Sequence, residues 1–298
     1  MCRGIRYNEG KGGVAVSRKE LNGIAVAGAI LSDGTEKPVC AGCVPNVSTM
    51  VKKLFPKTPV SAIGVVGDDV VGQYAISCMQ SAGVDTSGVR IGDASGNFGI
   101  GDMVFRDLSC KILHLDYCLM MDKIVDGDGR KILKHARNCG METSLSMQRG
   151  VSDRYAAVLA ALPYADYFVV SLEDGAWLTK MDPETDGIEK IARRLLWYGV
   201  KKKVFVFSDQ WVACCTKTQY DLLGNFILPE GNFICDAFYA GALMGLQNGW
   251  SDMRILEFST ACAAAAKTGA QMETAKDAAN FCRQLTRYKR GCLINDFV

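Results

Sequence analysis

The chain has 298 residues, of which 49% are hydrophobic and 22% are charged, so its composition is that of a globular protein and excludes a disordered one. Its 34 Lys and Arg residues balance 32 Asp and Glu residues to a formal net charge of +2. Because this balance provides neither the basic face that duplex nucleic acid requires nor a polybasic membrane anchor, we expect neither nucleic acid nor a membrane among its partners.

The predicted elements alternate along most of the chain. Residues 1–21 are polar and Gly-rich, which predicts an N-terminal extension outside the core. Buried apolar runs typical of strands then alternate with segments of helical periodicity. We expect strands at residues 24–31, 60–66, 112–115, 143–146, 167–171 and 204–207. We expect helices at 47–54, 71–82, 129–138, 152–162, 188–198, 236–248, 251–268 and 274–288.

Residues 89–110 depart from this alternation. Four glycines interrupt short alternating runs there, which is typical of an antiparallel ribbon rather than a βαβ unit. Elsewhere the alternation predicts an α/β protein with a mostly parallel sheet covered on both faces. No linker or repeat divides the chain, so we expect a single domain over residues 1–298, with ligands at the carboxyl ends of its strands.

Thirteen cysteines raise the question of disulfides or metal binding. The odd number, and the lack of an apolar leader after Met1, predict reduced thiols in a cytoplasmic protein. The longest apolar run, residues 24–31, is about a third of a membrane span. Cys40 and Cys43 form a CxxC without a second pair or a nearby His, which favours buried or incidental thiols over a metal site.

The most informative segment is residues 231–250, where a loop leads into a helix that begins with a carboxylate, Asp236. A helix N-terminus offers unpaired N–H donors and a positive dipole end, which suit a phosphate. The carboxylate has two interpretations on these grounds. It is either a helix N-cap or a base that accepts a proton from an attacking hydroxyl.

The sequence DAFYAGALMGLQNGW at residues 236–250 resembles the second signature of the ribokinase, or pfkB, family of carbohydrate kinases. Other family motifs have counterparts in the same order. These are AGAILSD at residues 27–33, AGCVPN at 41–46, SAIGVVGDDVVG at 61–72 and GVDTS at 83–87. The similarity extends over residues 22–290, and the ordered set is more specific than any one motif.

The resemblance implies a Rossmann-like, three-layer α/β/α ribokinase-like fold with a small β lid, here at residues 32–40 and 89–110. It implies transfer of the γ-phosphoryl group of ATP, with Mg²⁺, to a hydroxyl of a sugar or nucleoside-like small molecule. Asp236 matches the catalytic base, while Asp33, Gly42 and Asn46 match positions that hold the substrate. The family also suggests a homodimer formed through the lid strands.

The nucleotide half of the family pattern is eroded. Phe233, Ile234 and Cys235 replace the Gly-Ala-Gly that precedes the base. Ser171 and Asp174 replace the Asn and Glu linked with phosphate and Mg²⁺, which leaves Asp174 as the candidate metal residue. Ser208 stands in a strand end that has lost both family glycines, and Arg149 alone remains of an Asp-x-Asn-x-Arg motif.

Two functions are therefore compatible with the sequence. The first is an ATP-dependent kinase that phosphorylates a sugar or sugar-like substrate with Asp236 as base. The second is a catalytically impaired protein of the same fold, which binds a sugar or metabolite as a sensor or interaction partner. The four altered nucleotide motifs together motivate the second. In one of them Phe233 and Ile234 would crowd the loop before Asp236, because bulky residues resist the backbone geometry that glycines permit.

Overall fold

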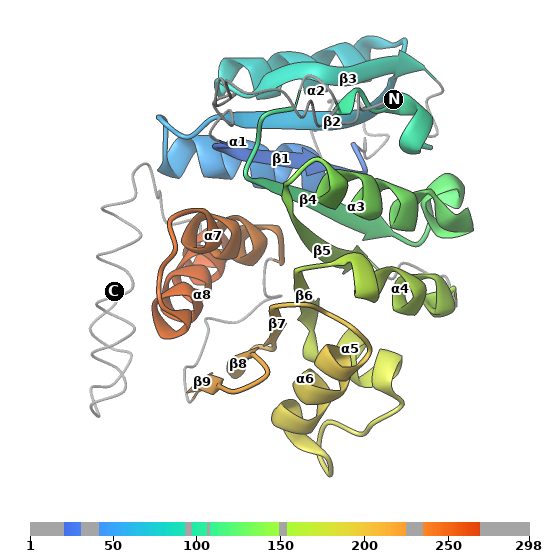
Figure 1. Ribbon diagram of the computed structural model, residues 1–298. Coiled ribbons are helices and arrows are strands. Elements are labelled where there is room, and N and C mark those ends of the chain that lie inside the picture. Colours follow the sequence, from blue (N-terminus) through green and yellow to red (C-terminus); the bar gives the residue numbers. More distant parts are fainter. Residues whose placement is uncertain are drawn as a thin grey trace, which may run out of the picture.

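The computed structural model of the chain describes residues 21–30, 42–92, 97–105, 108–148, 154–224 and 235–268. These residues form a nine-stranded sheet with helices on both faces (Figure 1). The predicted three-layer α/β/α fold class is therefore confirmed. Three predicted segments lie outside the described residues: the N-terminal extension up to residue 20, the first lid segment at 32–40 and the helix at 274–288.

The sheet has the strand order β3-β2-β1-β4-β5-β6-β7-β8-β9. Strands β1 to β7 pair in parallel, while β8 and β9 extend the sheet by antiparallel pairing. The strands are β1 (Ile24–Ala27), β2 (Val60–Gly67), β3 (Asp85–Gly92), β4 (Ile112–Cys118), β5 (Glu142–Gln148), β6 (Tyr167–Ser171), β7 (Lys203–Phe207), β8 (Trp211–Cys215) and β9 (Tyr220–Gly224).

The helices divide between the two faces of the sheet, each group sharing one hydrophobic core (Figure 1). One face carries α1 (Cys43–Leu54), α2 (Val70–Ser81), α7 (Cys235–Gln247) and α8 (Asp252–Thr268). The other carries α3 (Gly129–Asn138), α4 (Tyr155–Ala161), α5 (Leu172–Thr179) and α6 (Gly187–Trp197).

The sequence of β1 explains why it occupies the middle of this sandwich. Successive side chains of a strand point to opposite faces, so a strand buried on both faces is apolar at every position. Ala25 and Ala27 belong to the core under α3 and α4, whereas Ile24 and Val26 belong to the core under α1 and α7. The continuous apolar run that predicted a buried strand is thus divided between two cores.

The predicted antiparallel ribbon over residues 89–110 is wrong at its beginning. Residues 89–92 belong to β3, an edge strand that runs parallel to β2, with Val89 opposite Gly64 and Ile91 opposite Val66. Helix α2 returns the chain to this open edge, so the segment completes the βαβ unit that the glycines obscured. Further along, Ile100–Asp102 form a 3₁₀ turn.

Strands β8 and β9 were not predicted as a pair of antiparallel strands. They form a hairpin on the β7 edge, with Phe207 opposite Val212 and Cys215 opposite Tyr220. The side chains of Cys214 and Cys215 in β8 are both buried. Only five residues make up each strand, and polar positions interrupt β9, so periodicity alone carried little signal.

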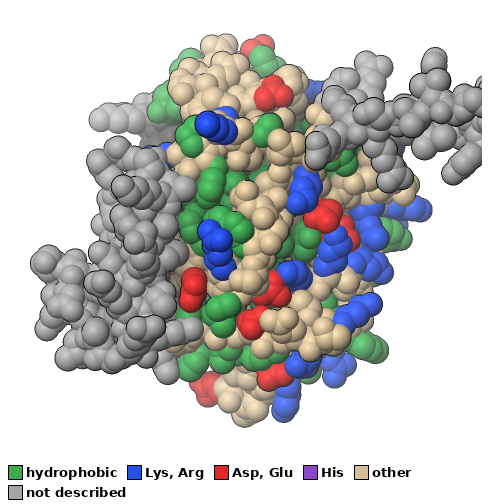
Figure 2. All heavy atoms as spheres, turned by 60° about the vertical axis from the view of Figure 1, so that its left-hand side comes forward, with side chains coloured by type: hydrophobic (Ala, Val, Ile, Leu, Met, Phe, Trp, Pro, Cys, Tyr) green, Lys and Arg blue, Asp and Glu red, His purple; other side chains and the backbone are tan. Residues whose placement is uncertain are grey.

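Basic, acidic and apolar side chains are intermixed on the face shown in Figure 2, which carries the left-hand elements of Figure 1. Trp250 and Phe258 stack edge to face, with ring centroids 5.1 Å apart, and help hold α8 in place. None of the helices in the described part of the chain combines the length and apolar character needed to cross a membrane.

Helices α7 and α8 approach closely at two glycines of α7. A Cβ on Gly241 would lie 2.7 Å from the Cα of Ser259, and a Cβ on Gly245 would lie 2.6 Å from Ile255. The first obstacle is backbone, which cannot move aside without shifting the helix. These glycines therefore determine how near α8 packs to the helix that begins with Asp236.

Replacing Gly241 tests this packing. We expect Gly241→Val to lower the free energy of unfolding by roughly 3 kcal/mol, because the added carbons overpack the contact with Ser259. The measurement is urea unfolding followed by circular dichroism. The matched control is Gly101→Val, because no atom lies within 4 Å of a Cβ at Gly101, and its cost should stay below about 1 kcal/mol. Equal losses in the two variants would contradict the packing role of Gly241.

Candidate active site at the carboxyl edge of the sheet

The candidate site forms where the carboxyl ends of central parallel strands meet the first turns of α1 and α7. Helix α1 follows β1 after the Gly42 position, and α7 begins at Cys235. Ligands of open parallel α/β sheets bind at this edge, beyond the ends of the strands. The structure thus brings together described residues of two predicted motifs, 42–46 and 236–250.

Asp236 and Asn46 make the central contact of the site. The Nδ2 of Asn46 donates a hydrogen bond of 2.7 Å to the Oδ2 of Asp236, although 190 positions separate the two residues. Burial raises the pKa of Asp236 above its ordinary value, and the hydrogen bonds with Asn46 and Cys43 counter part of that rise. Among the described residues a neutral amide and a thiol act on this carboxylate, and no cation does.

Gly42 holds the start of α1 in the position that this contact requires. Its φ of 98° lies in the left-handed region that favours glycine. The next turn is tied to the end of β1 by a backbone hydrogen bond of 3.3 Å from Val44 to Ala29. This geometry explains why the motif keeps Gly42, and it directs Asn46 from the first turn of α1 toward Asp236.

A buried polar cluster lies beneath this contact, on the face of the sheet that α1 and α7 cover. His114 and Asp116 of β4 stand directly opposite Ser144 and Ser146 of β5 in the strand register. The Nδ1 of His114 lies 3.0 Å from the hydroxyl of Ser144, and its Nε2 lies 3.3 Å from that of Ser146. All four side chains are fully buried.

Cys43 connects the cluster to Asp236. Its Sγ lies 3.8 Å from the Nε2 of His114, and its thiol also hydrogen-bonds Asp236. Burial raises the pKa of Cys43 well above its ordinary value and lowers that of His114 to about 3. The cluster therefore contains a protonated thiol and a neutral imidazole, so its negative charge resides on carboxylates.

Asp116 is the unusual member of the cluster. The hydroxyl of Ser146 donates a hydrogen bond of 3.2 Å to its Oδ1, but its Oδ2 has no hydrogen-bond partner among the described residues. Burial first, and the charge of Asp236 second, raise the pKa of Asp116 to about 7. Gly28 makes room for it, because a Cβ there would lie 2.8 Å from the Cβ of Asp116.

The predicted nucleotide residues lie at the next strand ends. Ser171 is the N-cap of α5 and accepts a 3.0 Å hydrogen bond from the backbone N–H of Asp174. Asp174 and Asp209, which follow β6 and β7, both raise the pKa of the Cys235 thiol electrostatically. Burial is the larger cause, and the pKa of Cys235 reaches about 12, so this thiol stays protonated.

Ser208 serves the turn between β7 and β8. Its hydroxyl accepts hydrogen bonds from the backbone N–H of Trp211 at 3.0 Å and of Gln210 at 3.3 Å. It also donates to the carbonyl of Trp211 at 3.1 Å. These hydrogen bonds hold the Ser208 side chain within its own turn, at a strand end where the family pattern has glycines.

The structure brings together Gly42, Asn46 and Asp236, and places Asp174 and Cys235 within electrostatic range of one another. The remaining predicted site residues, Asp33, Arg149, Phe233 and Ile234, lie outside the described residues.

Sequence reasoning did not identify Asp116, His114 or Asp209 as members of the site. His114 is fully buried and has three polar neighbours, Cys43, Ser144 and Ser146. The available signal was the alternation of His114 with Asp116 and of Ser144 with Ser146. Polar residues at alternate positions of two buried strands share one face of the sheet.

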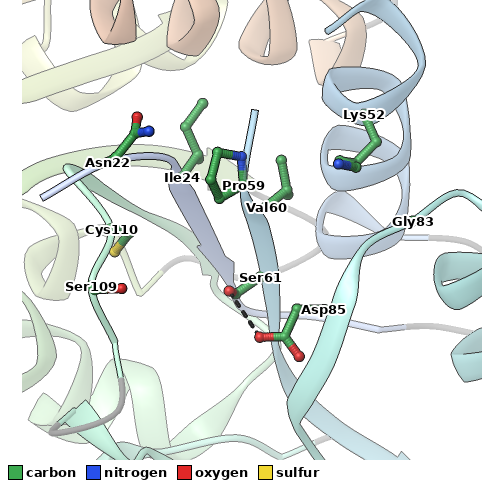
Figure 3. A pocket seen from close by; sticks show the side chains of 10 residues that line it. All are labelled: Asn22, Ile24, Lys52, Pro59, Val60, Ser61, Gly83, Asp85, Ser109 and Cys110. Carbon is green, nitrogen blue, oxygen red and sulfur yellow. Dashed lines mark hydrogen bonds between the residues drawn. The ribbon is translucent and has the colours of Figure 1, made fainter. Parts of the chain in front are cut away.

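The opposite edge of the sheet carries a separate pocket, shown in Figure 3. It lies at the amino ends of β1, β2 and β3, where Ile24, Val60 and Asp85 line it. Ser61 donates a 3.3 Å hydrogen bond to Asp85 inside it, and Lys52 donates to two backbone carbonyls. Its polar groups are thus partnered within the protein, and it plays no part in the candidate site.

Comparisons with known proteins agree with this geometry at the level of the fold. No protein-family model matches the sequence, and no curated protein matches it either. Solved structures do match. A 2-dehydro-3-deoxygluconokinase from Thermotoga maritima superposes with a TM-score of 0.73 at 13% identity, covering 88% of this chain and 98% of its own.

Two further solved structures match over similar lengths. A fructokinase from Xylella fastidiosa with bound ATP has a TM-score of 0.72 at 17% identity, covering 88% of this chain and 99% of its own. A PfkB family carbohydrate kinase from Listeria grayi has a TM-score of 0.68 at 17% identity, covering 87% and 99%. The chain therefore has the ribokinase-like fold of the pfkB carbohydrate kinases, and the resemblance found in its motifs is confirmed for the fold.

Proposed function

We propose that the chain is a carbohydrate kinase of the pfkB type, which transfers the γ-phosphoryl group of ATP to a hydroxyl of a sugar or sugar-like substrate. The observation that carries this proposal is the 2.7 Å contact between Asn46 and Asp236 at the carboxyl edge of the sheet. It joins a polar substrate-side residue to a carboxylate on the first turn of a helix, the two components that phosphorylation of a hydroxyl requires.

Asp236 supplies the base in this proposal. Phosphoryl transfer depends mostly on positioning and charge stabilisation, with a base to orient the attacking hydroxyl and accept its proton. Asn46 fixes one carboxylate oxygen and counters part of the rise in pKa that burial causes, which favours the ionised form and orients it. The first turn of α7 also contributes N–H donors and a positive dipole end toward the phosphate.

Asp174 and Asp209 fit an Mg²⁺ ion that accompanies ATP. Both carboxylates act electrostatically on Cys235 at the start of α7, so both lie on the side of the site where the phosphates would approach. Mg²⁺ is usually held by one or two carboxylates together with substrate phosphates, rather than by a full set of protein ligands. Within the described residues no cluster of three His, Cys, Asp or Glu side chains forms such a set. The ion would neutralise the phosphate charge.

The substrate class rests on the fold and on the polar character of the acceptor side. The matching structures are named as a fructokinase, a 2-dehydro-3-deoxygluconokinase and a PfkB family carbohydrate kinase, and the fructokinase holds ATP. Hydroxyl-rich acceptors suit a site whose described groups are an amide and a carboxylate. We therefore place sugars and sugar acids first among candidate substrates, with nucleosides second.

A substrate screen tests the proposal. The full chain is incubated with Mg·ATP and a panel of ketoses, aldoses, sugar acids and nucleosides, and formation of ADP is measured with a coupled assay. The proposal expects at least one acceptor to increase ADP formation well above the rate without acceptor. A complete panel with no acceptor-dependent ADP formation would contradict it.

The pH dependence of turnover provides a further prediction. Asn46 lowers the pKa of Asp236, so Asn46→Ala should raise it and move the acid limb of kcat/KM to higher pH by about one unit. Thr49→Ala is the matched control, because Thr49 lies one turn later on α1 and donates to the carbonyl of Pro45 instead. An acid limb that moves equally in both variants, or in neither, would count against the proposed role of Asn46.

A further inference from the structure

Asp116 is a carboxyl group that the proposed reaction does not use, yet a chain of contacts through Ser146, His114 and Cys43 joins it to Asp236, the residue proposed as base. It is fully buried at the end of β4 and its Oδ2 lacks a partner among the described residues. Burying an unpaired carboxylate is costly, so such a group persists where its surroundings favour the protonated form or where it acts on a neighbour. The glycine at position 28 is what allows it to fit.

We propose that Asp116 is a positioning residue that holds a proton beside Asp236, and that loss of this proton places a second negative charge in the site and sets the alkaline limit of phosphoryl transfer. The inference rests on the proposed function, since its consequence is read in turnover. Its physical basis, the interaction between the two carboxyl groups, is independent of any substrate.

The surroundings of Asp116 support a group that gains a proton easily. Its neighbours on β4 and β5 are the neutral His114 and the hydroxyl of Ser146. From α1, the protonated thiol of Cys43 lies between His114 and Asp236, and from α7 the phenol of Tyr239 faces the cluster. No cation contributes to the interactions of Asp116 within the described residues.

The charge of Asp236 also reaches the remaining titratable groups of this cluster. The pKa values of Cys43 and Tyr239 are raised, first by burial and then by charges that include both Asp116 and Asp236. The pKa of the Cys118 thiol, further along β4, is raised by burial and then by the charge of Asp116. Since these groups keep their protons, Asp116 is the member of the cluster whose charge changes near neutral pH.

The sequence of ionisation follows from these contacts. Asp236 ionises first, because Asn46 and Cys43 hydrogen-bond its carboxylate. Asp116 then retains its proton to about pH 7, through burial and the charge of Asp236. Above that pH the site carries two carboxylates, and the second repels the incoming phosphates of ATP. The hydrogen bond from Ser146 lowers the pKa of Asp116 and so favours its ionisation.

Two variants separate this role from a purely structural one. Asp116→Asn retains an oxygen that can accept from Ser146 but cannot ionise, so the alkaline limb of kcat/KM for ATP should be lost while the acid limb stays. In the native chain kcat/KM for ATP should fall by about tenfold per pH unit along the alkaline limb. Ser146→Ala removes the hydrogen bond that lowers the pKa of Asp116, so the limb should move to higher pH.

The closing experiment follows the carboxyl groups directly and needs no turnover. The full chain labelled with ¹³C at aspartate carboxyl carbons is titrated by NMR, and the resonance of Asp116 is assigned by its loss in Asp116→Asn. We expect a midpoint near pH 7 that falls in Asp236→Asn, because the neighbouring charge is gone. A midpoint in the ordinary aspartate range, or one unchanged by Asp236→Asn, would overturn the inference.

The two proposals fail in different ways. If the native chain turns over no acceptor while the titration of Asp116 responds to Asp236→Asn, the proposed function fails and the coupling between the carboxyl groups stands. If turnover is found but Asp116→Asn retains the same alkaline limb, the inference fails and the proposed function stands. Should Asp116→Asn not fold, the shift of the limb in Ser146→Ala decides in the same way.

Discussion

Asp236→Asn is expected to lower kcat by about 10²–10⁴-fold with a sugar acceptor, the range that a positioned acid–base group contributes. The substitution keeps the size of the side chain and leaves an oxygen to meet Asn46, but it removes the charge that accepts the proton of the hydroxyl. The measurement is steady-state turnover at saturating Mg·ATP and acceptor. Because the carboxylate is proposed to act on the reacting proton, KM for the acceptor should change much less than kcat.

Asp68→Asn is the matched control for this experiment. Asp68 is an exposed carboxylate in the turn between β2 and α2, so replacing it removes one negative charge from the chain, as Asp236→Asn does. Its turnover should remain within about twofold of the native chain, since the Asp68 side chain is exposed and is not among the groups that act on Asp236. If Asp236→Asn kept native kcat with every acceptor, Asp236 would not be the base.

Phe238→Ala is expected to lower the free energy of unfolding by about 3–5 kcal/mol. Phe238 is fully buried in the first turns of α7, and its ring packs against Phe207 of β7 with centroids 4.9 Å apart. Truncation leaves a cavity between helix and sheet that the glycine-mediated packing of α8 cannot easily close. Chemical denaturation with a fit of both midpoint and slope measures the loss.

An exposed aromatic residue provides the comparison for Phe238. Trp197 at the end of α6 is 74% exposed, and it makes a cation–π contact with Arg194 at 5.4 Å and a tilted ring contact with Tyr198 at 5.7 Å. Trp197→Ala should therefore cost less than about 1 kcal/mol, although it removes a larger side chain. A Phe238→Ala variant as stable as Trp197→Ala would show that α7 is not anchored through this ring.

The central sheet was predictable because burial on both faces leaves a clear mark on a strand. The apolar run at residues 24–31 and the strand predicted at 60–66 both correspond to strands of the sheet, although β1 itself ends at Ala27. Parallel order then followed from the helices between the strands, since a crossover of that length returns the chain in the same direction.

The edges of the sheet were harder to predict for a physical reason. Edge strands bury one face at most, so their sequences need not be apolar. In β3 the described side chains are exposed or half-buried throughout, and its glycines weaken any alternation. The same reasoning applies to β9, in which Leu223 alone is fully buried. The positions of β3 and β9 are determined by their pairing with a neighbouring strand. The local periodicity of a sequence contains no information on that pairing.

The two halves of the site differ in the same way. Asn46 and Asp236 could each be singled out from motif order, because both motifs had a recognisable pattern and position, although their contact was not predicted. Asp116 could not, since its importance depends on what lies opposite it on β5 and above it on α1 and α7. A single buried acid in an apolar strand is a signal of function only when its partners are known.

One measurement tests the central claim most directly, namely transfer of label from terminally labelled ATP to an acceptor. The native chain and Asp236→Asn are incubated with Mg²⁺, labelled ATP and the acceptors of the screen, and products are separated by chromatography. We predict a labelled sugar phosphate with the native chain and a loss of at least a hundredfold with Asp236→Asn. Tight binding of a sugar by calorimetry, without binding of Mg·ATP and without any labelled product, would contradict this account and identify a binding protein instead.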